Sequence, residues 1–166
     1  MAIKDMLLPE YDHEMAVTRR LLERAPEADF GWRPHEKSMS LGNLATHITN
    51  IPTWTSWITT MTEFDVVGLA PDSAPKVPAT RAELLERFDR TVANARALID
   101  GKSDPELLAM WTFKKGGQTV FTMPRIVALR RFMMNHSVHH RGQLSVYLRL
   151  RNVPLPAMYG PTADEG

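Results

Sequence analysis

Residues 124–151 have the sequence PRIVALRRFMMNHSVHHRGQLSVYLRLR, which predicts a long helix at the end of the chain. Pro124 suits the first position of a helix, where its missing amide hydrogen is not needed, and Asn152 is typical of a helix end. At about 100° per residue the apolar positions gather on one arc of this helix, and His136 and His140 lie within that arc. Four arginines of the same helix point the other way: Arg130, Arg131, Arg141 and Arg149.

The spacing of His136 and His140 indicates a metal site. They are four residues apart, so two imidazoles of one helix can reach a single cation. Two neutral imidazoles in a core must also find hydrogen-bond partners or lose their solvation energy, and a shared divalent ion satisfies both. His139 lies near the edge of the same arc, so a pair of His136 and His139 stays open, although the angle favours His140.

Three further amphipathic helices are predicted, over about 4–24, 41–61 and 81–100. His47 lies at the centre of the apolar stripe of the second helix, and we expect Pro52 to bend that helix just after it. Taken alone, His47 is better explained as a hydrogen-bonded core histidine. Inward-facing histidines on two separate helices favour a metal site instead, because helix bundles build such sites from facing helices.

Four long helices with extended connections predict an all-α fold, a four-helix bundle that is not a simple up-down-up-down one. The chain is short enough to form one domain over residues 1–166. A Pro-rich connection is expected at 67–80, and a short hairpin at 110–123, before the last helix, with Lys-Gly-Gly as its turn. Two tryptophans of the second helix, Trp54 and Trp57, are interpreted as core or pocket walls.

The net charge of +1 is unevenly distributed. Residues 107–163 contain eight basic and no acidic residues, so the rest of the chain carries the opposite excess. Two complementary faces of one fold, or of a dimer, explain this pattern, and binding of a nucleic acid or an anionic ligand is the alternative. The basic stripe lacks interleaved aromatic residues and a recognition motif, so no nucleic-acid partner is expected.

Several classes of protein are excluded. The chain has no cysteine, so any thiol must come from a substrate. Ser137 follows the first histidine where a zincin has its catalytic glutamate, and the last helix has no carboxylate for a di-iron site. Lys4 and Asp5 interrupt any signal peptide, and the uncharged stretch 38–62 is too polar to cross a membrane, so a cytoplasmic protein is predicted.

Two segments resemble the DinB-like (DinB/YfiT-like) family of metalloenzymes. They are LGNLATHITNIPTWTSW at 41–57 and NHSVHHRGQLSVYLRLRNVPLPAMYG at 135–160, and the second is close to the family signature H-x-x-x-H-R-G-Q-L. The resemblance covers the whole chain in helix order. It implies a four-helix bundle of up-down-down-up topology, a homodimer, and a metal bound by His47, His136 and His140.

Three imidazoles would leave a divalent ion, zinc or nickel, with an open position. Some members of the family are thiol-dependent transferases or isomerases. We therefore expect an enzyme that activates an exogenous low-molecular-weight thiol against an electrophilic small molecule. A metal-hydroxide hydrolase and a non-catalytic metal-binding stress-response protein remain alternatives, and no general base stands out. His13 and His35 are expected to be exposed or in loops.

Overall fold

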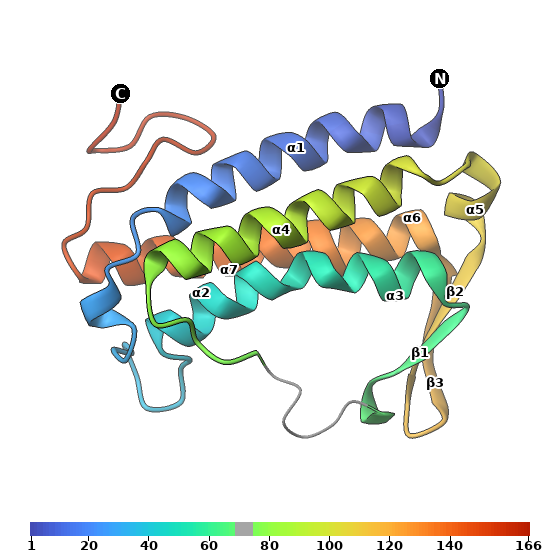
Figure 1. Ribbon diagram of the computed structural model, residues 1–166, viewed down its shortest axis with the longest axis horizontal. Helices are drawn as coiled ribbons and strands as arrows, with labels where there is room; N and C mark the ends of the chain where they lie inside the picture. The colour runs from blue at the N-terminus through green and yellow to red at the C-terminus, as the bar shows by residue number, and fades with distance from the viewer. Residues whose placement is uncertain (69–74) are drawn as a thin grey trace.

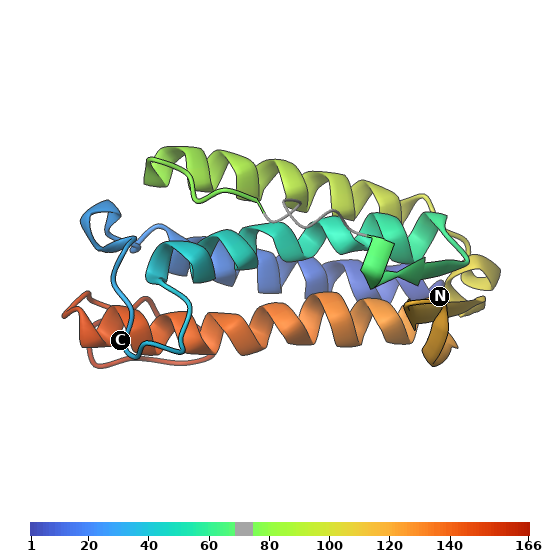
Figure 2. The same cartoon turned by 90° about the horizontal axis from the view of Figure 1, so that it is seen from below.

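Long helices lie side by side along the molecule, and a small β-sheet stands at one end of them (Figures 1 and 2). The computed structural model describes residues 1–68 and 75–166. The helices α1 (Ile3–Leu22) and α7 (Asn135–Leu150) run in one direction, and α2 (Leu41–Asn50), α3 (Trp54–Thr60) and α4 (Arg81–Asp100) run in the other. Helix α1 contacts α4 and α7, and α2 contacts the same two helices from the other side.

Short polar side chains begin two of these helices. Ser40 Oγ accepts the amide hydrogen of Asn43 at 3.2 Å at the start of α2. Thr80 Oγ1 accepts that of Glu83 at 3.2 Å at the start of α4, and the carboxylate of Glu83 accepts from the amide of Ala79. These contacts satisfy amide groups that a helix start leaves free. The predicted bounds 81–100 are confirmed.

The predicted second helix is interrupted at its proline, as expected. Pro52 lies in a 3₁₀ turn, Ile51–Thr53, that separates α2 from α3. Proline has no amide hydrogen to donate to the preceding turn, which weakens a regular α-helix at this point. The interruption lies one turn after His47.

The last helix is less regular than predicted. It starts at α6 (Arg125–Ala128), continues through a π-helical segment, η4 (Leu129–Met134), and ends with α7. Pro124 is the residue before α6 and closes a strand, so it is not the first helical residue. At the other end Asn152 adopts a φ of 58°, and the amide of Val153 donates to the carbonyl of Leu148. This left-handed turn ends the helix.

The prediction of an all-α chain is wrong, because the structure contains a three-stranded mixed sheet. Its strands are β1 (Glu63–Asp65), β2 (Met110–Lys115) and β3 (Gln118–Pro124), in the order β1-β2-β3. β2 and β3 are antiparallel and form the expected hairpin, whose turn has Gly116 and Gly117 at φ of 60° and 76°. β1 adds a parallel strand. Three residues are too few to show an alternating pattern, so the sequence did not reveal β1.

The carboxylate of Asp65 holds β1 against the hairpin. Its oxygens accept the amide hydrogens of Gly116 at 2.9 Å and Gly117 at 2.6 Å. The short helix α5 (Asp104–Leu108), which precedes the hairpin, was not predicted either. The Pro-rich connection expected at 67–80 lies partly outside the described residues.

One continuous core fills the space between the helices. Among the described residues, no helix is long and apolar enough to cross a membrane. Fully buried apolar side chains come from all the long helices and from the turn at Pro52, among them Tyr11, Leu22, Leu44, Ile51, Ile58, Phe88, Leu144 and Leu148.

Candidate metal centre

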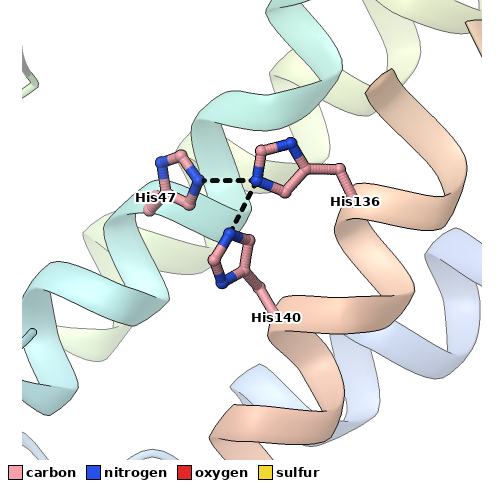
Figure 3. A group of neighbouring side chains, drawn as sticks. All are labelled: His47, His136 and His140. Atoms are coloured by element: carbon pink, nitrogen blue, oxygen red, sulfur yellow. Dashed lines mark hydrogen bonds between the residues drawn. The ribbon is translucent and has the colours of Figure 1, made fainter. Parts of the chain in front are cut away.

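The three histidines predicted to bind metal lie together between α2 and α7 (Figure 3). His47 comes from α2, and His136 and His140 come from successive turns of α7; we call these residues the three-histidine cluster. The Nε2 atoms of His47 and His136 are 3.3 Å apart, and those of His136 and His140 are 2.6 Å apart. His47 and His136 are half-buried, so the cluster is accessible from outside the core. Three histidines so placed could form a metal site.

Gln143 selects the tautomer of one neutral ring of the cluster. Its side-chain oxygen lies 2.7 Å from Nδ1 of His140. An amide oxygen can only accept, so Nδ1 of His140 carries the hydrogen and Nε2 keeps its lone pair. This contact points the lone pair of His140 toward the other two rings, as outer contacts of metal-binding histidines do.

Hydrogen bonds between the rings cannot satisfy all three Nε2 atoms. The Nε2 atom of His136 faces the Nε2 atoms of both His47 and His140. A neutral imidazole nitrogen either carries one hydrogen or offers one lone pair. At best one hydrogen on His136 is shared between two acceptors, whereas a cation at this point would bind the lone pairs of all three rings.

The distances also suit a metal ion. Zinc–nitrogen bonds of about 2.0–2.1 Å at tetrahedral angles hold two ligand nitrogens about 3.3 Å apart. His47 and His136 are at this separation. His136 and His140, at 2.6 Å, are closer, and small rotations about their side-chain bonds would separate them. The donor set therefore fits a divalent ion.

Burial keeps the cluster neutral. It lowers the pKa of His47 to about 4, with a further contribution from the neighbouring His140. Burial, and then the other histidines nearby, lower the pKa of His136 to about 4. Burial also lowers the pKa of His140, against the opposing effect of Gln143. Neutral imidazole is the form that binds metal, so these ligands need no deprotonation at neutral pH.

The remaining histidines lie outside the cluster. His13 and His35 are exposed, as predicted. His139 is also exposed, and its ring centre is 4.9 Å from that of His140. The structure therefore brings His140, and not His139, together with His136 and His47.

The helical arc predicted that Arg141 points into solvent, and this prediction is wrong. Its side chain is 1% exposed and lies against α1. The guanidinium donates to the carbonyl of Glu14 at 2.9 Å, to its carboxylate at 2.6 Å and to Thr18 Oγ1 at 3.1 Å. It also donates to the hydroxyl of Tyr159, which in turn donates to Glu14 at 2.7 Å. Arg141 thus joins α7, α1 and the C-terminal segment beside the cluster.

An aromatic cavity of about 620 Å³ adjoins the cluster. His47 and His136 form one part of its lining, and the strands β1 and β2 contribute to another. None of the lining residues that the structure describes carries a formal charge. The aromatic members of the lining are Trp54, Trp57, Phe64, Trp111, Phe113 and Phe132.

The residues of the aromatic cavity were only partly predicted. Trp54 and Trp57 are confirmed as pocket walls, and the Trp54 ring lies 5.0 Å from that of His136. Phe64 and Phe113 were missed because they reach the cavity from paired strands, and the β1 strand was not foreseen. Gln143 was missed too, although its position three residues after His140 was a usable signal, since metal-binding histidines usually need an outer acceptor.

Most of the basic residues at 107–163 form ion pairs within the chain. Five of the eight basic residues at 107–163 form ion pairs with acidic residues from other parts of the chain, so the interpretation of complementary faces is confirmed for these. The pairs are Lys114 with Glu63, Arg130 with Glu10, Arg141 with Glu14, Arg149 with Asp164 and Arg151 with Asp29.

Comparison with known sequences identifies the family to which the chain belongs. The sequence model of the DinB family matches residues 4–166. The chain belongs to the DinB family. A relative of this DinB protein is the uncharacterized protein YrdA of Bacillus subtilis (strain 168), 28% identical over 164 residues, which are 97% of this chain and 90% of YrdA.

Two solved structures have the same fold as this DinB protein. A DinB-like protein from Bacillus cereus ATCC 10987 has a TM-score of 0.72 at 21% identity, over 95% of this chain and 98% of its own. The DinB-like protein YjoA from Bacillus subtilis has a TM-score of 0.71 at 18% identity, over 93% and 99% of the two chains. The likeness in fold therefore extends over nearly the whole length of this chain.

Proposed function

We propose that this DinB protein is a metal-dependent enzyme that transfers a low-molecular-weight thiol to an electrophilic small molecule. The observation that carries the proposal is the convergence of three neutral Nε2 atoms beside an aromatic cavity. His47, His136 and His140 would hold a divalent ion, zinc or nickel. When bound, such an ion lowers the pKa of a coordinated thiol or water and so supplies a nucleophile at neutral pH.

The chain's own residues would position the reactants. Gln143 holds His140 in the tautomer that keeps its Nε2 lone pair, and the cavity receives the electrophile on the side of His47 and His136. In the transfer the thiol sulfur forms a bond to the electrophilic carbon. The bond from that carbon to the leaving group breaks with its electron pair, and the thiol proton passes to solvent.

Thiol transfer is favoured over hydrolysis by the lining of the cavity. A metal hydrolase commonly uses a carboxylate as general base and to protonate the leaving group. No carboxylate is among the described residues that line the aromatic cavity. A thiol needs less help, since its pKa of about 8.5 is already close to neutral.

The test begins with metal content. We expect about one equivalent of zinc or nickel in the native protein and in His139→Ala, and less than a tenth of that in His136→Ala. Both substituted side chains are on α7, but only His136 is in the cluster. Metal retained in full by His136→Ala would refute the proposed centre.

Turnover is tested with the metal-loaded protein, 1-chloro-2,4-dinitrobenzene, and glutathione, bacillithiol or mycothiol in turn. We expect free thiol to be consumed and chloride released in equal amounts with at least one thiol, and His136→Ala to be about 100-fold slower or worse. Turnover of esters or amides with no thiol consumed would favour the hydrolase. No turnover of either kind despite bound metal would favour a metal-binding protein without catalysis.

The homodimer implied by the family resemblance remains a prediction, as does a single domain over residues 1–166. Sedimentation of the metal-loaded protein would measure its oligomeric state. Unfolding curves from fluorescence and circular dichroism that coincide would support a single domain.

A further inference from the structure

We infer that the electrophile is an uncharged, planar aromatic compound, held between two walls of aromatic rings with its reacting carbon toward the three-histidine cluster. The inference rests on the proposed function for the reaction but on the aromatic cavity alone for the ligand class. Its evidence is the orientation of the rings, the absence of charge in the described lining, and the side-chain amide of Asn50.

The first wall consists of rings that lie nearly parallel. Trp54 and Trp57 differ by 15° in orientation, with ring centres 6.4 Å apart, and Trp57 and Phe64 differ by 10°, with centres 4.2 Å apart. No ring fits between Trp57 and Phe64 at that distance, so a ligand would pack against the wall and not within it. We call these three residues the tryptophan wall.

The second wall also consists of nearly parallel rings. The rings of Phe113 and Phe132 differ by 13° in orientation, with centres 6.5 Å apart. Phe121 supports them without lining the cavity, with its ring 4.8 Å from Phe132 and tilted by only 5°. The guanidinium of Arg131 lies over Phe121 and Phe132, at 5.9 and 5.3 Å from the ring centres. We call Phe113 and Phe132 the phenylalanine wall.

The two walls converge at the sheet and reach the cluster separately. Phe64 and Phe113 are opposite each other in the β1–β2 pair, with ring centres 6.3 Å apart and an angle of 34° between the planes. Away from the sheet, the Trp54 ring lies 5.0 Å from His136, and Phe132 precedes His136 by four residues on the same helix. A flat ligand between the walls therefore has one edge toward the cluster.

The chemistry of the lining specifies the rest of the ligand. Flat aromatic surfaces favour stacked or edge-to-face contact with another aromatic ring over contact with a thicker saturated one. A charged group would lose its hydration in this cavity, since no described lining residue offers an opposite charge. The volume, about 620 Å³, is within the range of sites for one small molecule.

Asn50 offers a polar contact near the cluster. It lies one turn after His47 and lines the cavity, and among the described residues its side-chain amide has no hydrogen-bond partner. A carbonyl, amide or nitro group on the aromatic ring would find both donor and acceptor there. We expect this contact to orient the ring, with Asn50 acting as a specificity residue.

The experiment is a calorimetric titration of the metal-free protein with three probes of similar outline: 2-naphthamide, 2-naphthoate and trans-decalin-2-carboxamide. We expect 2-naphthamide to bind about tenfold or more tightly than the charged and the saturated compound. Equal affinity for the decalin compound would overturn the aromatic assignment, and equal or tighter binding of 2-naphthoate would overturn the uncharged one. This comparison uses the unsubstituted sequence, so it does not depend on the folding of variants.

Variants then locate the binding site. Trp57→Leu and Asn50→Ala should each weaken 2-naphthamide binding by about five- to tenfold, whereas Trp32→Leu, a half-buried tryptophan outside the cavity, should not change it. Equal effects of Trp57→Leu and Trp32→Leu would overturn the assigned location. His140→Ala, which loses a proposed metal ligand but no cavity-lining residue, should still bind 2-naphthamide. Loss of metal with retained naphthamide binding thus separates this inference from the proposed function.

Discussion

Removing the amide of Gln143 should weaken metal binding without disturbing the fold. Gln143 is exposed and contacts the cluster through one hydrogen bond, 2.7 Å from its oxygen to Nδ1 of His140. A neutral hydrogen bond contributes about 0.5–1.5 kcal/mol, and loss of an outer partner of a metal ligand costs about 10–100-fold in affinity. Water can partly replace an exposed acceptor, so we expect Gln143→Leu to lose about tenfold in zinc affinity, equivalent to about 1.4 kcal/mol.

A second substitution at the same position should act in the opposite direction. Gln143→Glu places a carboxylate against Nδ1 of His140, and a charge-assisted hydrogen bond makes the ring a stronger donor to a cation. We expect zinc to bind at least about threefold more tightly than to the native protein. Opposite signs from two substitutions of similar size would exclude a purely steric effect.

The assay is competition for zinc against a chromophoric chelator at pH 7.5, with the urea unfolding midpoint of each metal-free variant as a check on the fold. His139→Gln is the matched control, because His139 is exposed beside His140 but is not in the cluster. The reasoning is refuted if Gln143→Leu binds zinc as tightly as the native protein, or no more weakly than His139→Gln does.

Three further predictions concern stability. Folding lowers the pKa of His47 and of His136 from 6.5 to about 4, so between these pH values the unfolded chain binds protons that the folded chain does not. The metal-free protein should therefore lose stability as the pH falls from about 6.5 to about 4. A His47→Gln/His136→Gln variant should show a smaller loss in urea titrations. Arg141→Met should cost about 3–5 kcal/mol of unfolding free energy, since it leaves the carboxylate of Glu14 unpaired in a largely buried place; a loss below about 1 kcal/mol would show that the pair is not needed. Gly42→Ala should cost about 1–3 kcal/mol by thermal unfolding, because a Cβ there would lie 2.9 Å from Phe30 Cβ, whereas Gly142→Ala, with nothing within 4 Å, should not destabilise the protein.

The helices and the cluster could be predicted because their signals are local. Periodicity and capping residues located α1, α4 and the break at Pro52, since each depends on neighbours within a few positions. His136 and His140 share one helix face, so their spacing alone placed them together. His47 needed a different argument, from the apolar stripe of its own helix and from the family resemblance, because no local pattern relates residues 89 positions apart.

The sheet and the aromatic cavity could not be predicted in the same way. Phe64 meets Phe113 across a parallel pair that joins segments nearly 50 residues apart, and β1 is only three residues long. Short strands take their stability from their partners and not from their own sequence. The walls of the cavity therefore became visible only when these segments were placed in space.

Arg141 shows where the helical arc misleads. The prediction treated the last helix as having one buried side and one solvated side. Helix α7 instead packs against both α2 and α1, and the second contact contains a buried ion pair, so a charged residue marks an interior position. A helix with two packed neighbours can therefore look amphipathic in sequence although its polar side is partly buried. Arg141 lies on the polar side of α7 and is only 1% exposed.

Both helices that carry the cluster depart from regular α-helix where the aromatic cavity begins. The 3₁₀ turn at Pro52 lies between His47 and Trp54, and the π-helical segment contains Phe132 and ends just before His136. A turn that is too tight or too wide changes the direction of the side chains that follow it, and π-helical turns are frequent at functional sites. In each helix a regular part holds the metal-binding side chains, and the irregular part contains or directly precedes an aromatic residue of the cavity lining, Phe132 in one helix and Trp54 in the other. The two irregular turns thus mark, in each helix, the change from metal-binding side chains to aromatic side chains of the cavity.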